Sequence, residues 1–160
     1  MKSMRLWLAL ALALACFLLA CSASHDAQIF QEPQLGVPES RGDNPWMPGT
    51  VPQSMPAPPG TYINMALAPG QLHPGDWGTF DAIPNVHFVR NDLAVTPAFK
   101  AQVASVQRYR VPAGVEIETG IVGPQEFDGI VYPGGANQVR ILHFKDTGLL
   151  VPVGPAIPIH

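Results

Sequence analysis

SVQRYRVPAGVEIETGI, residues 105–121, is the stretch of sequence that decides the fold class. It holds two short runs rich in β-branched and other apolar residues, separated by Pro112 and Gly114. Short runs of this kind, bounded by Gly and Pro, are typical of strands, because these two residues end regular structure and favour turns. The stretch therefore predicts two strands, at residues 105–111 and 115–121.

The same punctuation by Gly and Pro continues over residues 61–160. It predicts five further strands, at residues 62–67, 86–89, 129–132, 138–144 and 149–153. One helix is expected at residues 96–104, because Thr96 suits the N-cap, Pro97 the first helical position, and Phe99 and Val103 follow at helical spacing. The fold class expected is a small α+β domain at residues 61–160, mostly an antiparallel β-sheet with one or two short helices.

The N-terminal residues have the pattern of an export signal. Lys2 and Arg5 precede an uncharged run at residues 6–20, which as a helix reaches about 22 Å and falls short of the roughly 30 Å core of a bilayer. The run ends on Leu18-Leu19-Ala20-Cys21, which resembles the bacterial lipobox. We expect residues 1–20 to be a signal peptide and Cys21 to be lipidated; the alternative is an ordinary signal cleaved after Ala20 or Ala23.

Lipidation at Cys21 implies a bacterial membrane-anchored lipoprotein on the periplasmic or surface side. If the cell has two membranes, Ser22 after the cysteine favours the outer one, by resemblance to known sorting rules. Residues 33–59 contain eight prolines, so residues 21–60 are expected to form a semi-stiff tether. Trp46 and Met47 are the tether residues expected to dock onto the domain.

Composition excludes several classes of function. Both cysteines lie at or before residue 21, so the mature chain can form no internal disulfide. Residues 21–160 hold 7 of the 9 Lys and Arg and all 12 Asp and Glu, a formal charge of −5, which argues against a nucleic-acid partner. The five histidines are scattered without paired spacing, so no metal site is expected.

Two groups of residues could carry chemistry. Glu116 and Glu118 stand two apart on one predicted strand, so their carboxylates share a face, as a catalytic pair or as a solvated surface. Gly134 and Gly135 would let the backbone approach a ligand closely, and Gln138 offers a donor and an acceptor. A tight turn between strands explains these glycines equally well.

The C-terminal half resembles the tuberculosis necrotizing toxin family, which are secreted NAD⁺ glycohydrolases. The resemblance rests on a Tyr-x-Val strand, a Gly and a Pro at fixed distances after it, a Pro-Gly-Gly-Gly-x-Gln turn, in which this chain has Ala136 for the third Gly, and a Gly-x-Phe element followed by Pro. These are Tyr109, Val111, Gly120, Pro124, Pro133-Gly134-Gly135-Ala136-Asn137-Gln138, Gly78-Thr79-Phe80 and Pro84.

The resemblance implies a site and a reaction. Gln138 would be the functional glutamine, and Arg108, Tyr109, Gly134 and Gly135 would bind the nicotinamide and ribose of NAD⁺. One of Glu116, Glu118 and Glu126 would stabilise positive charge as the glycosidic bond breaks. NAD⁺ would be the substrate, and no cofactor would be needed.

The chain departs from the family pattern in two places. No Arg or Lys lies in residues 61–77, where the family has an arginine for the dinucleotide phosphates; Arg90 and Arg108 are the candidate substitutes. An insertion also separates Pro124 from Pro133. Three hypotheses therefore stand: an NAD glycohydrolase or ADP-ribose transferase, a non-catalytic module that binds NAD⁺ or a protein partner, and a structural envelope lipoprotein.

Overall fold

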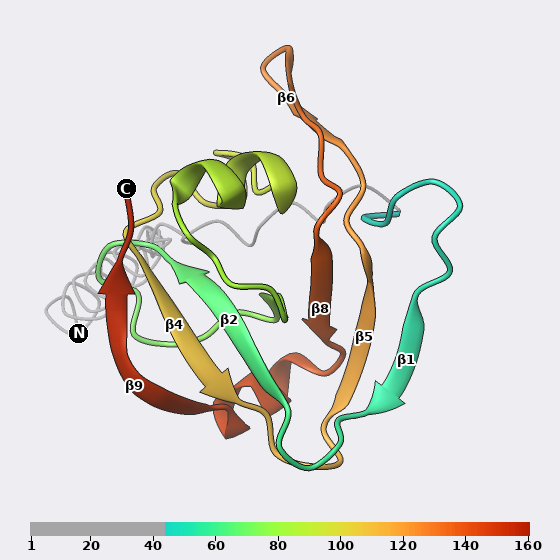
Figure 1. The fold of residues 1–160 in the computed structure, drawn as a ribbon, viewed down its shortest axis with the longest axis vertical. Helices are drawn as coiled ribbons and strands as arrows, with labels where there is room; N and C mark the ends of the chain where they lie inside the picture. Colours follow the sequence, from blue (N-terminus) through green and yellow to red (C-terminus); the bar gives the residue numbers. More distant parts are fainter. Residues whose placement is uncertain (1–43) are drawn as a thin grey trace, which may run out of the picture. The chain divides into compact units, whose positions relative to one another are not determined.

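The computed structural model describes residues 44–160, which fold into two antiparallel sheets and a separate hairpin (Figure 1). The four-stranded sheet has the order β1 (Gln53–Pro56), β5 (Glu116–Ile121), β8 (Asn137–Ile141) and β3 (Trp77–Gly78). The three-stranded sheet has the order β2 (Tyr62–Leu67), β4 (Ser105–Arg110) and β9 (Val151–Pro158). The hairpin pairs β6 (Gln125–Phe127) with β7 (Ile130–Tyr132), and two short helices, η1 (Phe88–Asp92) and η2 (Phe144–Leu149), complete the domain. The predicted fold class is thereby confirmed.

The main core lies between the two sheets. In β2, Ile63, Met65 and Leu67 are buried and alternate with more exposed residues, as the two-residue period of a strand requires. They pack in one cluster with residues of β5 and β8, among them Ile117 and Ile141, both 1% exposed. The two sheets are therefore held face to face by apolar side chains.

The segment expected to be a strand at residues 86–89 is helical, so that prediction was wrong. The Oδ1 atom of Asn85 accepts a hydrogen bond from the backbone N–H of Phe88 at 2.9 Å, and η1 follows. Val89, fully buried, anchors η1 in a second cluster with Leu93 and Ile159. A local cap and this packing outweigh the β-propensity of the two valines.

The helix predicted at residues 96–104 is also wrong, since only one turn forms there. The carbonyl of Thr96 accepts hydrogen bonds from the N–H groups of Phe99 and Lys100, both at 3.1 Å. Ala104 then donates to the carbonyl of Leu67 at 2.9 Å, which draws the chain into the sheet. The hydrogen bond between Ala104 and β2 therefore replaces any continuation of the helix beyond its first turn.

Part of the proline-rich segment belongs to the folded domain. Its residues 53–56 form β1, which pairs with β5 over four positions. Trp46 is 6% exposed and forms a bridge with Val122. The domain therefore begins before residue 61, and Trp46 docks on it. The predicted signal peptide at residues 1–20, the predicted lipidation site Cys21 and the predicted tether up to residue 43 lie outside the described residues.

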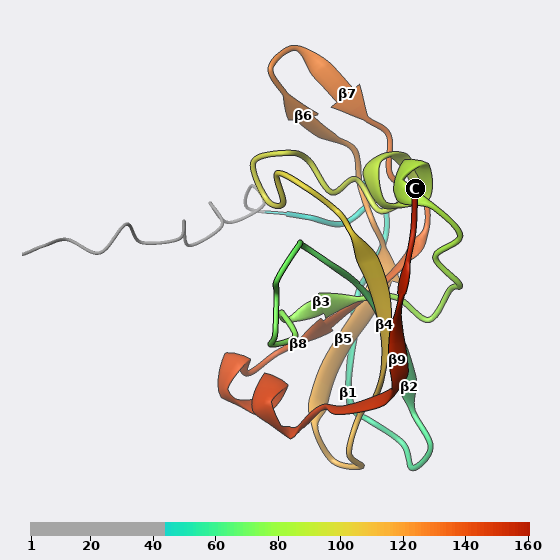
Figure 2. The same ribbon diagram turned by 90° about the vertical axis from the view of Figure 1, so that its left-hand side faces the viewer.

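The insertion before Pro133 forms the β6–β7 hairpin, which extends beyond the two main sheets (Figure 2). Asp128 and Gly129 make its turn, with φ angles of 52° and 72°.

In the part of the chain that the structure describes, no helix is long and apolar enough to cross a membrane.

Candidate functional site

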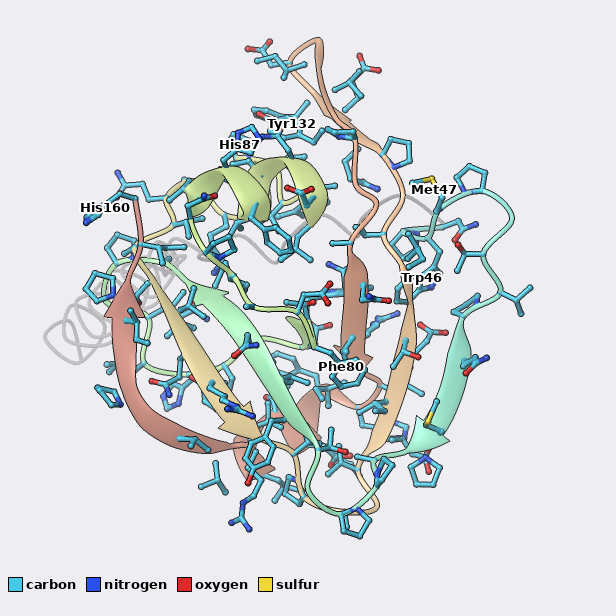
Figure 3. All side chains as sticks on the ribbon, in the orientation of Figure 1. Trp46, Met47, Phe80, His87, Tyr132 and His160 are labelled. Carbon is cyan, nitrogen blue, oxygen red and sulfur yellow. The ribbon has the colours of Figure 1, made fainter. Side chains whose placement is uncertain are left out.

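An open pocket of about 210 Å³ lies beside the four-stranded sheet. Figure 3 shows Phe80, one of its walls, between the two sheets, with Trp46 beside β5. Four separate segments contribute to the pocket: the loop before β1 with the first residue of β1, the residue Phe80 after β3, the end of β5 and the start of β8. The lining residues are Thr50, Val51, Gln53, Phe80, Thr119, Gly120, Ile121, Asn137 and Gln138.

The segment Thr79 to Asp81 is fixed against the start of β8. The hydroxyl of Thr79 donates to the carbonyl of Asn137 at 2.7 Å and accepts the N–H of Asp81 at 3.0 Å. The backbone N–H of Asn137 donates in return to the Oδ2 atom of Asp81 at 3.2 Å. Because Thr79 is fully buried, its two hydrogen bonds hold this segment in place and set the position of Phe80.

Phe80 is 47% exposed although its neighbour Thr79 is fully buried. A large aromatic ring that stays half exposed in a pocket offers a flat apolar surface to a ligand. Around it, Thr50, Gln53, Thr119 and Asn137 carry neutral side chains that can donate and accept hydrogen bonds. The pocket is therefore suited to a flat, polar ring.

Gln138, the glutamine singled out in the sequence, lines the pocket, but the residue is only 2% exposed. It stands opposite Gly120 in the β5–β8 ladder, and opposed residues share a face of the sheet. The ring of Trp46 covers this face, since a Cβ on Gly120 would lie 2.8 Å from it. Gln138 is thus held under Trp46 and exposes little surface to a ligand.

Gly134 and Gly135 shape the backbone beside the pocket without lining it. Gly134 donates to the carbonyl of Asn91 at 2.7 Å, and Gly135 to that of Val122 at 2.9 Å. A Cβ on Gly134 would lie 2.5 Å from the carbonyl oxygen of Val122. Gly134 allows two stretches of backbone to touch at the entry to β8, which agrees with the tight-turn alternative drawn from the sequence.

The remaining predicted site residues lie elsewhere in the domain. Tyr109 is 4% exposed in the main core, where burial raises the pKa of its phenol. Arg108 lies 4.5 Å from the centre of the Tyr62 ring. Glu116 and Glu118 share one face of β5, as expected, and neither lines the pocket. Glu126 is exposed on β6. Of the eight residues proposed for catalysis or substrate binding, the pocket includes Gln138 alone.

The cations expected to replace the missing arginine are also outside the pocket lining. Arg90 donates to the carbonyls of Val95 at 2.8 Å and Ala101 at 3.1 Å, and burial lowers its pKa. Arg140 lies 3.8 Å from the carboxylate of Asp76 and packs over the ring of Trp77. No Lys or Arg lines this pocket. A search of residues 44–160 for three or more His, Cys, Asp or Glu that could hold a metal ion found no such group.

Sequence reasoning missed most of the lining. Phe80 lies in the Gly-x-Phe element and Asn137 in the glycine turn before Gln138. Their place in these two motifs was the signal that could have identified them as lining residues. Thr50, Val51 and Gln53 were assigned to the tether because of the prolines around them. Trp46, a large apolar residue in a proline-rich segment, was the one indication that this segment packs on the domain.

The comparisons with known proteins point to one solved structure. No protein-family model matches the chain, and no curated protein matches it. Among solved structures, the chain is similar to Tne2, determined in complex with Tni2, with a TM-score of 0.60 and 27% sequence identity. The match covers 72% of this chain and 99% of the Tne2 chain. The folded domain therefore resembles a complete Tne2 chain.

Proposed function

We propose that the folded domain binds NAD⁺ in the pocket beside Phe80 and cleaves its nicotinamide glycosidic bond. The observation that carries this proposal is the meeting of three short motifs at one pocket. Phe80 of the Gly-x-Phe element, Gly120, and Asn137-Gln138 at the end of the glycine turn all line it, although 58 residues separate Phe80 from Gln138.

The pocket offers the physical requirements of this reaction. The ring of Phe80 can stack on nicotinamide, and the amides of Gln53 and Asn137 can orient the carboxamide and the ribose hydroxyls. Holding the ring and sugar in one geometry lowers the entropic part of the barrier. Gln138, buried beside them, would orient these groups rather than contact the reacting bond.

The test is nicotinamide release from NAD⁺ by the full-length protein in detergent. Phe80→Ala should lower kcat/KM about tenfold, which corresponds to about 1.4 kcal/mol of lost transition-state binding. Phe144→Ala is the matched control, since this ring is 72% exposed on η2 and away from the pocket lining. If the parent protein releases no nicotinamide, the enzyme proposal fails.

A non-catalytic binding module is the second candidate. Two observations favour it: no charged side chain lines the pocket, and Gln138 is 2% exposed. In that case calorimetry would detect binding of NAD⁺, Phe80→Ala would abolish it, and no nicotinamide would appear on long incubation.

A lipid anchor at Cys21, on the periplasmic or surface side of a bacterial membrane, remains part of the proposal. Metabolic labelling with palmitate should label the parent protein, and Cys21→Ser should lose the label and leave the membrane fraction. A Cys16→Ser variant controls for the other cysteine. Unlabelled parent protein would favour the ordinary secretory signal.

A protein partner is the last part of the proposal. Tne2 was solved in complex with Tni2, so a dedicated binding protein is proposed for this domain as well. Such a partner would be supported if this protein and a candidate binding protein, purified separately and mixed, eluted as one species and if nicotinamide release were suppressed in that mixture.

A further inference from the structure

Asp81 places a carboxylate next to the pocket, whose own lining residues are all neutral. It follows Phe80 directly, and its Oδ2 atom accepts the N–H of Asn137 at 3.2 Å. Phe80 and Asn137 both line the pocket. A ligand stacked on Phe80 and bound to Asn137 would therefore lie near a negative charge, that of Asp81.

The position of Asp81 is set by its backbone as well as by its side chain. Its carbonyl accepts the amide N–H of Asn64 at 2.9 Å, and its N–H donates to the hydroxyl of Thr79 at 3.0 Å. On the carboxylate, the hydrogen bonds within the described residues go to Oδ2, at 3.2 Å from the backbone N and 3.5 Å from the side-chain N of Asn137. Oδ1 accepts none from those residues and is available to a ligand.

Three positive side chains of the domain, none of which lines the pocket, are engaged elsewhere. Arg90 donates to two backbone carbonyls, Lys100 to the side chain of Gln71 at 2.7 Å, and Arg140 lies against Asp76. A diphosphate needs cationic or N–H donors, and a carboxylate at the same place repels it. The pocket volume of about 210 Å³ is also below the roughly 300–1,000 Å³ of usual ligand pockets.

We propose that this pocket selects a positively charged N-riboside, a pyridinium riboside such as nicotinamide riboside, and does not require the adenylyl diphosphate half of NAD⁺. Asp81 is the specificity-determining residue, because its carboxylate is held beside the lining residue Asn137 and would attract the cationic ring and ribose stacked on Phe80. This inference rests on the proposed glycosidic cleavage and narrows its substrate class.

The charge of the ring changes during the reaction. The bond between C1′ of the ribose and the pyridinium nitrogen breaks, and its electron pair leaves with the now neutral nicotinamide. The positive charge passes to C1′ and the ring oxygen of the ribose, water adds its oxygen to C1′, and one proton is released to solvent. A fixed carboxylate stabilises the cation first on the ring and then on the sugar, without moving.

The cleavage test compares nicotinamide riboside with NAD⁺ as substrates of the full-length protein in detergent. Nicotinamide riboside should be cleaved with a kcat/KM within about tenfold of that for NAD⁺, since the diphosphate adds little binding. Cleavage of NAD⁺ with nicotinamide riboside more than about a hundredfold poorer would overturn this inference and leave the proposed function intact. Cleavage of neither substrate would overturn both.

A binding test isolates the role of Asp81 from turnover. Calorimetry should show that 1-methylnicotinamide, a permanent cation, binds at least about tenfold more tightly than neutral nicotinamide. Asp81→Asn keeps an oxygen acceptor for Asn137 and removes the charge, so this preference should disappear. Asp128→Asn, on the hairpin turn, is the matched control and should retain it. Equal binding of the two ligands by the parent protein, or a preference that survives in Asp81→Asn, would refute the inference.

Discussion

Single glycines control how closely the strands of this domain approach one another. Gly120, on β5, leaves room for the ring of Trp46. Gly134 leaves room for the carbonyl oxygens of Val122 and Gly123. At Gly120 the neighbour is the ring of a side chain, whereas at Gly134 it is backbone. Backbone cannot rotate away, so Gly134 is the less replaceable of the two.

The glycine at 134 should therefore be costly to replace. Gly60 and Gly134 have similar φ angles of 81° and 73°, but a Cβ on Gly60 would meet nothing within 4 Å. Gly60→Ala should lower the free energy of unfolding by about 1 kcal/mol, the cost of the left-handed conformation alone. Gly134→Ala should cost about 3 kcal/mol or more, because two carbonyl oxygens must also move. Urea unfolding of the two variants measures the difference, and equal losses would contradict the geometry.

Tyr109 should make the domain less stable at alkaline pH. Burial raises the pKa of its phenol in the folded state, while in the unfolded state the phenol titrates near pH 10. Below about pH 10 both states hold the proton and the contribution is constant; above it the unfolded state loses its proton first, so stability falls with pH. Urea unfolding between pH 8 and 11 should show this fall.

The matched variant for this pH effect is Tyr109→Phe, which removes the titrating group and keeps the ring. Its stability curve should be flatter above pH 10 than that of the parent protein. Lys100 acts with the opposite sign, because burial lowers its pKa and the folded state loses that proton first. A variant curve parallel to that of the parent would show that Tyr109 does not set the alkaline limb.

At the scale of elements, the β6–β7 hairpin combines one anchored end with an exposed tip. Tyr132 is 8% exposed and packs with Ala94 and Val122, whereas Val131, its neighbour on β7, is 60% exposed. Only the base of the hairpin is therefore part of a core. The tip adds little to stability, so its apolar side chains are free to contact other molecules.

Neighbouring substitutions in β7 test this division. Tyr132→Ala should lower the free energy of unfolding by about 3 kcal/mol, as for other large aromatic side chains in a core. Val131→Ala should change it by less than about 0.5 kcal/mol, because the side chain is already in water. Chemical denaturation measures both values, and a large loss at Val131 would mean that the tip packs on the domain.

Elements differed in how far the sequence could predict them. The strand at residues 62–67 was located to the residue, since one of its faces is buried and Gly60 and Pro69 bound it. Strand β1, by contrast, lies among prolines, and its place in the sheet depends on β5, a partner distant in sequence. The pocket was missed for the same reason, because Thr50, Phe80 and Asn137 meet only after the sheets have paired.

At the scale of the whole domain, the N-terminal segment is both a structural strand and a wall of the pocket. Met47 donates to the carbonyl of Ile121 at 2.8 Å, and Gly123 to that of Pro45 at 2.9 Å. Between Trp46 and β1, Thr50 and Val51 reach the pocket. The pocket therefore depends on residues 45–53 being packed against the domain.

The position of the N-terminal boundary gives a test at this scale. A chain beginning at residue 44 should fold, whereas one beginning at residue 61 loses Trp46, the β1–β5 ladder and three lining residues of the pocket. Loss of one buried Trp costs about 3–5 kcal/mol, a large part of the usual 5–15 kcal/mol of domain stability. Circular dichroism melts of the two chains should show a cooperative transition for the first and a much lower or absent one for the second. Trp46→Phe in the longer chain separates packing from chain length, and should bind 1-methylnicotinamide as the parent does if the strand alone forms the wall. Equal melting of the two truncated chains would show instead that residues 44–60 only rest on a domain that is complete without them.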